Sequence, residues 1–150
     1  MLKEQSIHHV PAGQGSCIPY MEHEMHVKLG AAQSNGELTL IEDLVPVDSG
    51  PPLHVHEKEN ETYYVLEGRF EFVCGPDRAE GGPGTFVFAP RGLPHRFKNI
   101  GRAPGRILVG FTPAGIEEYF SEVAAQTEVT PQIMTEIAGR HGITIVQAAV

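Results

Sequence analysis

The fold is decided by the stretch HVHEKENE, residues 54–61 of a 150-residue chain. His54 and His56 stand two positions apart, and alternate side chains of an extended strand share one face, so both imidazoles project the same way. Glu61 follows a charged stretch that is long enough to turn the chain back. The next strand can then bring the Glu61 carboxylate to the two histidines. This pattern predicts a metal site on a β-sheet.

A third histidine ends the stretch GTFVFAPRGLPH, residues 84–95. This stretch is typical of a glycine turn, an apolar strand and a tight Pro/Gly turn. We therefore expect one divalent metal ion with four protein ligands: His54, His56, Glu61 and His95. Three imidazoles and one carboxylate leave coordination positions free on a six-coordinate ion, which suits Fe, Mn, Ni or Zn without choosing among them.

The two stretches resemble the paired motifs of the cupin superfamily. The first motif contains a glycine, two histidines, a glutamate and a second glycine, which here are Gly50, His54, His56, Glu61 and Gly68. Three residues lie between Gly50 and His54, whereas the family usually has five. The ligands themselves stand at the spacing of the family.

The second motif of the family is G-x5-P-x-G-x2-H-x3-N. It is matched at every position, by Gly84, Pro90, Gly92, His95 and Asn99. The resemblance implies an all-β fold, the double-stranded β-helix or jelly-roll barrel, with C-terminal helices added to it.

Two other glutamates, Glu57 and Glu59, are alternatives for the carboxylate ligand. Six residues separate Glu61 from Gly68, as the family's motif requires, and this spacing favours Glu61. The resemblance also implies that Glu61 is the catalytic base, which deprotonates a substrate hydroxyl. A hydrophobic interior is expected to raise the pKa of its carboxyl.

Four segments resemble small single-domain proteins related to quercetin dioxygenases more closely: residues 52–56, 63–68, 84–92 and 111–120. This resemblance implies a mononuclear metal and oxidative cleavage of a small, bidentate enol, flavonol-like or diketone substrate. A dioxygenase is therefore the expected function. Two alternatives stay open: a non-oxidative isomerase or lyase that uses the metal as a Lewis acid, and a small-molecule-binding protein without catalysis.

Short apolar stretches alternate with turn residues along most of the chain, which has 17 glycines and 12 prolines. This pattern favours a sandwich or barrel over a parallel sheet with helices. The sequence predicts strands at residues 25–29, 37–45, 54–56, 61–67, 69–74, 85–89, 95–100 and 105–112. Asn35-Gly36 supplies the positive backbone angles of a hairpin turn, and residues 75–78 and 81–84 are expected to form further turns.

The pattern changes after Pro113. Apolar residues recur at helical spacing over 115–125, and Thr130-Pro131 is typical of the start of a second helix, which Gly142 ends. Residues 143–146 are expected to return to the barrel as an edge strand. Packing or a dimer contact, rather than chemistry, is the role expected for these elements.

The predicted strands and helices divide the chain into three segments. Residues 1–24 are an N-terminal arm, irregular except for one strand on a sheet edge. Residues 25–113 form the barrel, and residues 114–150 form a C-terminal helical extension that packs on it. The arm and the helices together favour a homodimer.

Strand parity assigns three pocket residues. Counting from Glu61 turns Tyr63 and Val65 inward, and counting from His95 turns Phe97 inward. We expect these three side chains to lie beside the substrate or in the core of the barrel.

A net charge of −8 argues against nucleic acid or an anionic membrane as a partner, and a small-molecule substrate is expected instead. The N-terminus has no signal-peptide pattern and no apolar run is long enough to span a bilayer, so a cytoplasmic location is expected. Cys17 and Cys74 are far apart and are expected to be free thiols.

Four further histidines, His8, His9, His23 and His26, have no carboxylate or cysteine beside them at chelating spacing. Surface or core roles are expected for them rather than metal binding.

Overall fold

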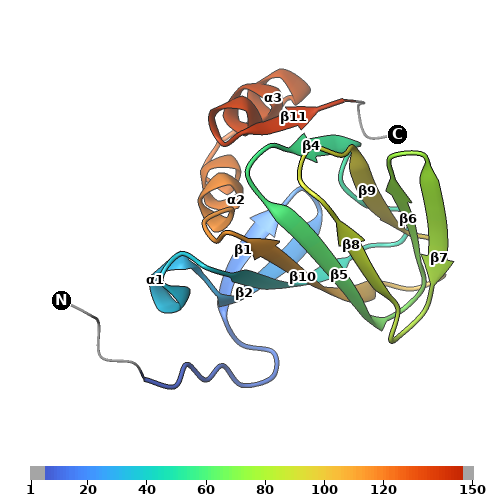
Figure 1. Cartoon of the computed structure of the whole chain (residues 1–150), viewed down its shortest axis with the longest axis horizontal. Helices are drawn as coiled ribbons and strands as arrows, with labels where there is room; N and C mark the ends of the chain where they lie inside the picture. Colours follow the sequence, from blue (N-terminus) through green and yellow to red (C-terminus); the bar gives the residue numbers. More distant parts are fainter. Residues whose placement is uncertain (1–5, 147–150) are drawn as a thin grey trace.

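Two antiparallel sheets form the body of the computed structural model, which describes residues 6–146 (Figure 1). The six-stranded sheet contains, in spatial order, β1 (Ser16–Tyr20), β2 (His23–Leu29), β3 (Thr39–Val45), β10 (Gly105–Thr112), β5 (Asn60–Glu67) and β8 (Phe86–Ala89). The five-stranded sheet contains β11 (Ile143–Ile145), β4 (His54–His56), β9 (His95–Asn99), β6 (Phe70–Cys74) and β7 (Asp77–Gly81). The predicted jelly-roll fold with C-terminal helices is confirmed.

The core lies between the two sheets, where alternate residues of the facing strands meet. On β6, Phe70 and Phe72 are buried, with exposed fractions of 0% and 2%, while Glu71 between them is half-buried. The Tyr63 ring lies 5.5 Å from the Phe72 ring and 5.3 Å from the Phe97 ring, measured between centroids. These aromatic contacts join β5 of one sheet to β6 and β9 of the other.

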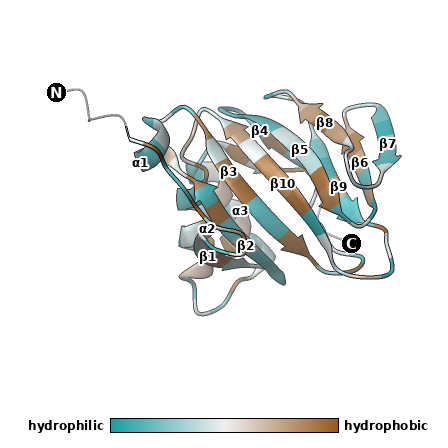
Figure 2. Cartoon of the chain, turned by 90° about the horizontal axis from the view of Figure 1, so that it is seen from below, coloured by the Kyte–Doolittle hydropathy of each residue, from teal (hydrophilic) through white to brown (hydrophobic). Residues whose placement is uncertain are grey.

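Strand β7 differs from the prediction, which placed a turn at residues 75–78. The turn is confined to Gly75 and Pro76, and the strand begins at Asp77. Its residues are mostly exposed and charged, because β7 pairs only with β6 at the sheet edge and has no buried face. Figure 2 shows β7 as largely hydrophilic, in contrast to the hydrophobic β10 at the centre of the other sheet. An edge strand of this kind carries no period-two hydrophobic signal.

The β2–β3 connection contains a short helix, α1 (Ala31–Ser34), in place of the simple hairpin turn that Asn-Gly predicts. Asn35 and Gly36 do adopt positive φ angles, of 55° and 79°, directly after this helix. The two strands still pair antiparallel, as predicted.

Two motif glycines have backbone reasons for their identity. A Cβ atom on Gly50 would lie 1.9 Å from the backbone oxygen of Phe97, so only glycine lets this loop approach β9. Gly92 has a φ of 84°, which a residue with a side chain rarely adopts, in the turn that leads to His95.

The C-terminal elements pack against the barrel (Figure 1). Helix α2 (Glu117–Ala124) contacts β1, and the hydroxyls of Tyr20 and Tyr119 lie 2.8 Å apart. Helix α3 (Pro131–Arg140) is capped by the Thr130 side chain, which accepts a hydrogen bond from the Ile133 amide. Strand β11 pairs with the histidine strand β4, which confirms the predicted edge strand.

The predicted arm contains β1, which pairs with β2 at the edge of the six-stranded sheet. The outermost parts of the predicted arm and extension, residues 1–5 and 147–150, lie outside the described residues. Among residues 6–146, no helix is long and apolar enough to cross a membrane.

Candidate metal centre

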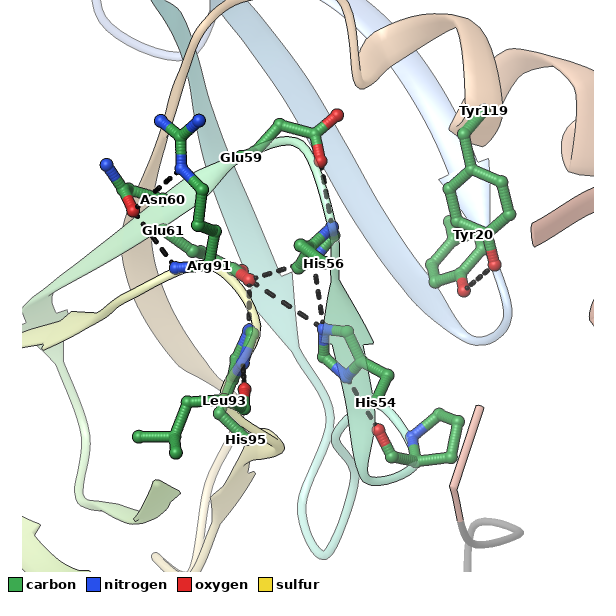
Figure 3. A network of polar contacts seen from close by, with 11 residues as sticks. Tyr20, His54, His56, Glu59, Asn60, Glu61, Arg91, Leu93, His95 and Tyr119 are labelled. Atoms are coloured by element: carbon green, nitrogen blue, oxygen red, sulfur yellow. Dashed lines mark hydrogen bonds and ion pairs between the residues drawn. The ribbon is translucent and has the colours of Figure 1, made fainter. Parts of the chain in front are cut away.

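Four side chains from the two histidine stretches lie together (Figure 3). One ligand atom from each of His54, His56, Glu61 and His95 lies within 4.8 Å of the others. All four residues are buried, with exposed fractions between 1% and 8%. A group of this composition, closed off from bulk water, could hold one metal ion.

Both sheets contribute to this group. Strand β4 presents His54 and His56 on one face, and its pairing with β9 places His95 directly opposite His54. Glu61 comes from β5 in the other sheet. Asn60, beside it, accepts a hydrogen bond from the backbone amide of Arg91, which ties β5 to the turn before His95. The group therefore forms only when the two sheets pack.

Backbone carbonyls fix the orientation of two imidazoles. His54 Nδ1 lies 2.8 Å from the Pro52 carbonyl oxygen, and His95 Nδ1 lies 2.9 Å from the Leu93 carbonyl oxygen. A carbonyl oxygen only accepts, so each Nδ1 carries the hydrogen that it donates. Each Nε2 therefore presents its lone pair to the centre of the group, as a metal ligand must.

The atoms that face the centre are all electron donors. His54 Nε2 and His56 Nε2 are 3.1 Å apart. Glu61 Oε2 lies 3.7, 3.0 and 2.6 Å from the Nε2 atoms of His54, His56 and His95, respectively. Lone pairs and a carboxylate at these separations repel one another unless a cation or a proton lies among them. The donor set fits a divalent metal ion for this reason.

The charges in this group depend on burial and on close partners. Burial by itself raises the pKa of the Glu61 carboxyl, but the three close imidazoles, with His56 as the charged one, outweigh it and hold that pKa well below its usual range. The expected rise of this pKa is therefore wrong, because the effect of the imidazoles exceeds that of burial. Burial lowers the pKa of His54. Burial opposes charge on His56 as well, but Glu59 and Glu61 outweigh it and raise the His56 pKa to about 9. Without a metal, His56 carries the proton among these atoms.

Glu59, one of the two alternatives for the carboxylate ligand, has a different position. Its side chain is buried, and its Oε2 atom lies 3.4 Å from His56 Nδ1, on the far side of the ring from the other ligands (Figure 3). A carboxylate there orients the imidazole and makes it a stronger ligand. Glu57, the other alternative, is exposed.

A cavity of about 50 Å³ adjoins the group. Its wall is mostly apolar and includes three of the four ligands. The lining residues are Tyr20, His23, Met25, Ile41, Asp43, Pro51, Pro52, His54, His56, Glu61, Phe97, Val109, Phe111, Tyr119, Phe120, Ile143 and Ile145. Apolar walls with a few polar groups are typical of small-molecule sites.

The three predicted pocket residues occupy different places. Phe97 lines the cavity. Tyr63 and Val65 point inward, as parity predicts, but they lie in the core between the sheets and do not line the cavity. Burial and, secondarily, the nearby Glu61 raise the pKa of Tyr63 well above its usual range, so its hydroxyl stays protonated.

The C-terminal extension contributes to the cavity, which its predicted packing role did not include. Tyr119 and Phe120 of α2, with Ile143 and Ile145 of β11, form part of the wall. In the sequence, the apolar residues of α2 recur at helical spacing. This spacing indicates that one face of the helix is buried, but it does not indicate which surface covers that face.

His23 and His26 have carboxylate or cysteine neighbours in space that their spacing in the sequence does not indicate. His23 is buried and bonds to Asp43. His26 lies within 4.8 Å of Glu24 and Cys17, through ligand-type atoms, in an exposed group on the outer face. Strand pairing brings these residues together, since Cys17 on β1 lies opposite His26 on β2. Spacing along one strand does not report this contact.

The other two of these four histidines, His8 and His9, lie before β1 and are exposed. His8 Nε2 lies 2.8 Å from the carbonyl oxygen of Lys28. Within residues 6–146, neither His8 nor His9 belongs to a group of metal-ligand type.

Comparisons with known proteins agree with this geometry. A model of the cupin domain matches residues 40–111. An uncharacterised protein of Methanocaldococcus jannaschii is 36% identical over 94 residues, which cover 63% of this chain and 70% of that protein. The matched domain contains every ligand of the candidate metal centre.

Solved structures show the same fold. A RmlC-like cupin from Shewanella frigidimarina superposes with a TM-score of 0.64 at 20% identity, covering 77% of this chain and 99% of that one. A predicted oxalate decarboxylase from Thermotoga maritima superposes with a TM-score of 0.58 at 24% identity, covering 67% and 92%. The chain belongs to the cupin superfamily.

Proposed function

We propose that this cupin is a mononuclear, metal-dependent dioxygenase that cleaves a small enol or diketone. The observation that carries the proposal is the convergence of three imidazole Nε2 atoms and Glu61 Oε2 beside an apolar cavity. A divalent ion held there would supply Lewis acidity and positions for substrate oxygen atoms.

The cavity supports a small substrate. Its volume of about 50 Å³ is room for roughly four water molecules. This favours a diketone or enol of a few carbon atoms over a flavonol. The apolar wall favours a ligand that is apolar apart from its chelating oxygens.

The carboxylate of Glu61 supports an acidic substrate. It is the one carboxylate among the four candidate ligands, and the enol of a 1,3-diketone, which is more acidic than an alcohol, can give it a proton. Glu61 Oε2 would take that proton, while the Nε2 atoms of the three histidines would hold the metal.

The test is oxygen uptake by protein loaded with Fe(II) or Mn(II), measured with an electrode against a panel of 1,3-diketones and enols. We expect uptake with at least one member, and a decrease of roughly 10²- to 10⁴-fold in Glu61→Gln. His54→Ala is expected to lose bound metal as well, measured by elemental analysis. His9→Ala, a matched change at an exposed histidine, should keep both metal and activity.

Two other outcomes would replace the dioxygenase proposal by one of the alternative functions. Turnover of the same panel under nitrogen would identify an isomerase or lyase. A small molecule that co-purifies and is released unchanged on denaturation, with no turnover in either condition, would identify a binding protein.

We also propose that the protein works in a reducing, cytoplasmic compartment. Cys17 and Cys74 are both free, and Cys17 is exposed. An exposed thiol in an oxidising compartment forms intermolecular disulfides or is oxidised further.

A further inference from the structure

A chain of hydrogen bonds that includes none of the candidate metal ligands links β2, β3 and the loop before β4. His23 Nδ1 lies 2.9 Å from Asp43 Oδ2, and His23 Nε2 lies 2.8 Å from Ser49 Oγ. Asp43 and His23 are buried, with exposed fractions of 1% and 3%. The carboxylate accepts from Nδ1–H, so Asp43 and Ser49 together hold the imidazole in one orientation.

This chain reaches the same cavity as the metal ligands. Asp43 and His23 both line its wall, whereas Ser49 does not. Phe97, two residues along β9 from His95, lines the same cavity, and its ring centroid lies 6.4 Å from that of His23. Both polar regions border one cavity with room for roughly four water molecules, so a ligand of a few carbon atoms could contact both.

One oxygen of this chain lacks a partner. Asp43 Oδ1 is buried and has no hydrogen bond within residues 6–146. Burial raises the pKa of the Asp43 carboxyl, and the bond from His23 only partly offsets it. A buried acceptor left without a donor costs stability, so an atom of this kind on a cavity wall points to a donor that comes with the ligand.

We propose that Asp43 Oδ1 is a second anchor of the substrate cavity and accepts a hydrogen bond from a hydroxyl group of the ligand. The inference rests on the proposed function, because the other end of the same ligand binds at the candidate metal centre. The substrate class becomes a hydroxylated diketone or enol, with its hydroxyl separated from the chelating oxygens by a short apolar chain.

The surroundings favour a neutral donor over an ammonium group. Met25, Ile41 and Val109 are apolar members of the same wall, and the Asp43 carboxylate is already bonded to His23. An ammonium group there would lose its water and find one free acceptor for its three N–H groups, whereas a hydroxyl needs only one acceptor.

The experiment measures binding by calorimetry to Zn(II)-loaded protein, without oxygen. The probes are a series of 1,3-diketones with a terminal hydroxyl at increasing chain length and their methyl-terminated counterparts. We expect the hydroxylated probe to bind at least about tenfold more tightly at one chain length. Asp43→Ala should remove this preference, because it removes the oxygen that accepts from the ligand hydroxyl and leaves no donor in its place. Glu42→Ala, a matched change on the outer face of the same strand, should keep it.

Equal affinities of the two series for the wild-type protein would overturn the anchor, as would failure of both to bind or a preference that survives in Asp43→Ala. The comparison of the two series on the wild-type protein needs no variant, so it tests the anchor even if Asp43→Ala does not fold. Oxygen uptake is measured separately with the Fe(II)-loaded protein. If a hydroxyl-selective probe binds but no oxygen is consumed, the dioxygenase proposal fails and the anchor stands.

Discussion

A proton and a metal ion compete for the same atoms at the candidate metal centre. In the structure, lone pairs of imidazoles and one carboxylate face each other at distances down to 2.6 Å, between His95 Nε2 and Glu61 Oε2. The His56 pKa of about 9 shows which residue takes the proton when no cation is bound. Metal binding must displace this proton, which links affinity to pH.

We therefore expect metal affinity to depend steeply on pH. Since His56 is protonated at pH 7 and titrates at about 9, the apparent affinity for Zn(II) should rise by about tenfold per pH unit over this interval and level off above it. Competition with a chromogenic chelator at fixed ionic strength measures this dependence. An affinity that stays constant between pH 7 and 9 would contradict the assignment of the proton to His56.

The free energy of unfolding of the metal-free protein should fall as the pH rises, whereas the metal affinity rises. The folded-state pKa of His56 lies above its ordinary value of 6.5, so its contribution to stability is fully present below pH 6.5 and is lost as the pH rises through about 9. Added metal should compensate for this loss at alkaline pH.

Glu59 is expected to matter for metal binding although it is not among the ligands. Its carboxylate lies 3.4 Å from His56 Nδ1 and is buried. Glu59→Gln should weaken metal affinity by roughly 10- to 100-fold, because the imidazole loses a negative partner that strengthens it as a ligand. Calorimetric titration of the variant with Zn(II) tests this. Glu57→Gln, an exposed change two residues away, should bind metal like the wild type; equal affinities in both variants would exclude the role given to Glu59.

At the scale of elements, the end of β9 joins the two sheets. Asn99 is fully buried and donates hydrogen bonds to the carbonyl oxygens of Val45, at the end of β3, and Ala103. Its own side-chain oxygen accepts from the Gly101 amide. This position of the second motif therefore serves the architecture, while His95 at the other end of the strand serves the metal centre.

Asn99→Ala should lower the free energy of unfolding by roughly 2–4 kcal/mol, because it leaves several buried backbone groups without partners. Metal affinity at 25 °C should stay near the wild-type value, since the ligands are at the far end of the strand. Urea unfolding of the Zn(II)-free and Zn(II)-loaded proteins measures both. Lys98→Ala, at the preceding half-buried position, is the control. A variant as stable as the wild type would contradict this role for Asn99.

The C-terminal elements have a functional place that their amphipathic pattern alone does not indicate. Strand β11 extends the sheet that carries the histidines, and α2 brings Tyr119 and Phe120 to the cavity wall. Glu122 on α2 pairs with Arg140, the last residue of α3, and with His141, which directly follows it. These pairs also hold the two helices to each other. The size of the cavity therefore depends on elements outside the matched cupin domain.

At the scale of the whole molecule, one outer face is unusually apolar. Tyr64, Phe86 and Phe88 have exposed fractions of 44%, 61% and 51%, and they lie on adjacent strands β5 and β8, with Tyr64 directly opposite Phe86. Strand β8 is also the edge of its sheet. Exposed aromatic groups beside an open edge are typical of an interface.

We propose that a second copy of the chain covers this face, which would make the protein a homodimer. Light scattering should give twice the mass of 16.3 kDa. The double variant Phe86→Ser, Phe88→Ser should be monomeric and still bind metal, whereas Val129→Ser, at another exposed apolar position, should stay dimeric. A wild-type protein that is monomeric at micromolar concentration would contradict the proposal.

The sequence by itself predicted most strands, both C-terminal helices and the four residues of the candidate metal centre, because the relevant signals are local. The jelly-roll fold was implied by the resemblance of two motifs to those of the cupin superfamily. The two-residue spacing of His54 and His56 places both on one face, and turn residues such as Gly92 mark where the chain must bend. The strand β7 escaped prediction because it has no buried face.

Only the tertiary structure decided which distant residues meet. His23 and Asp43 are 20 positions apart, and Tyr20 and Tyr119 are 99 apart, so their contacts depend on the order of strands in a sheet and on where α2 packs. The same holds for the pKa of Glu61, which three imidazoles lower against the effect of burial. Periodicity reports the face on which a side chain lies, whereas the partner that it meets there depends on how the sheets and helices pack.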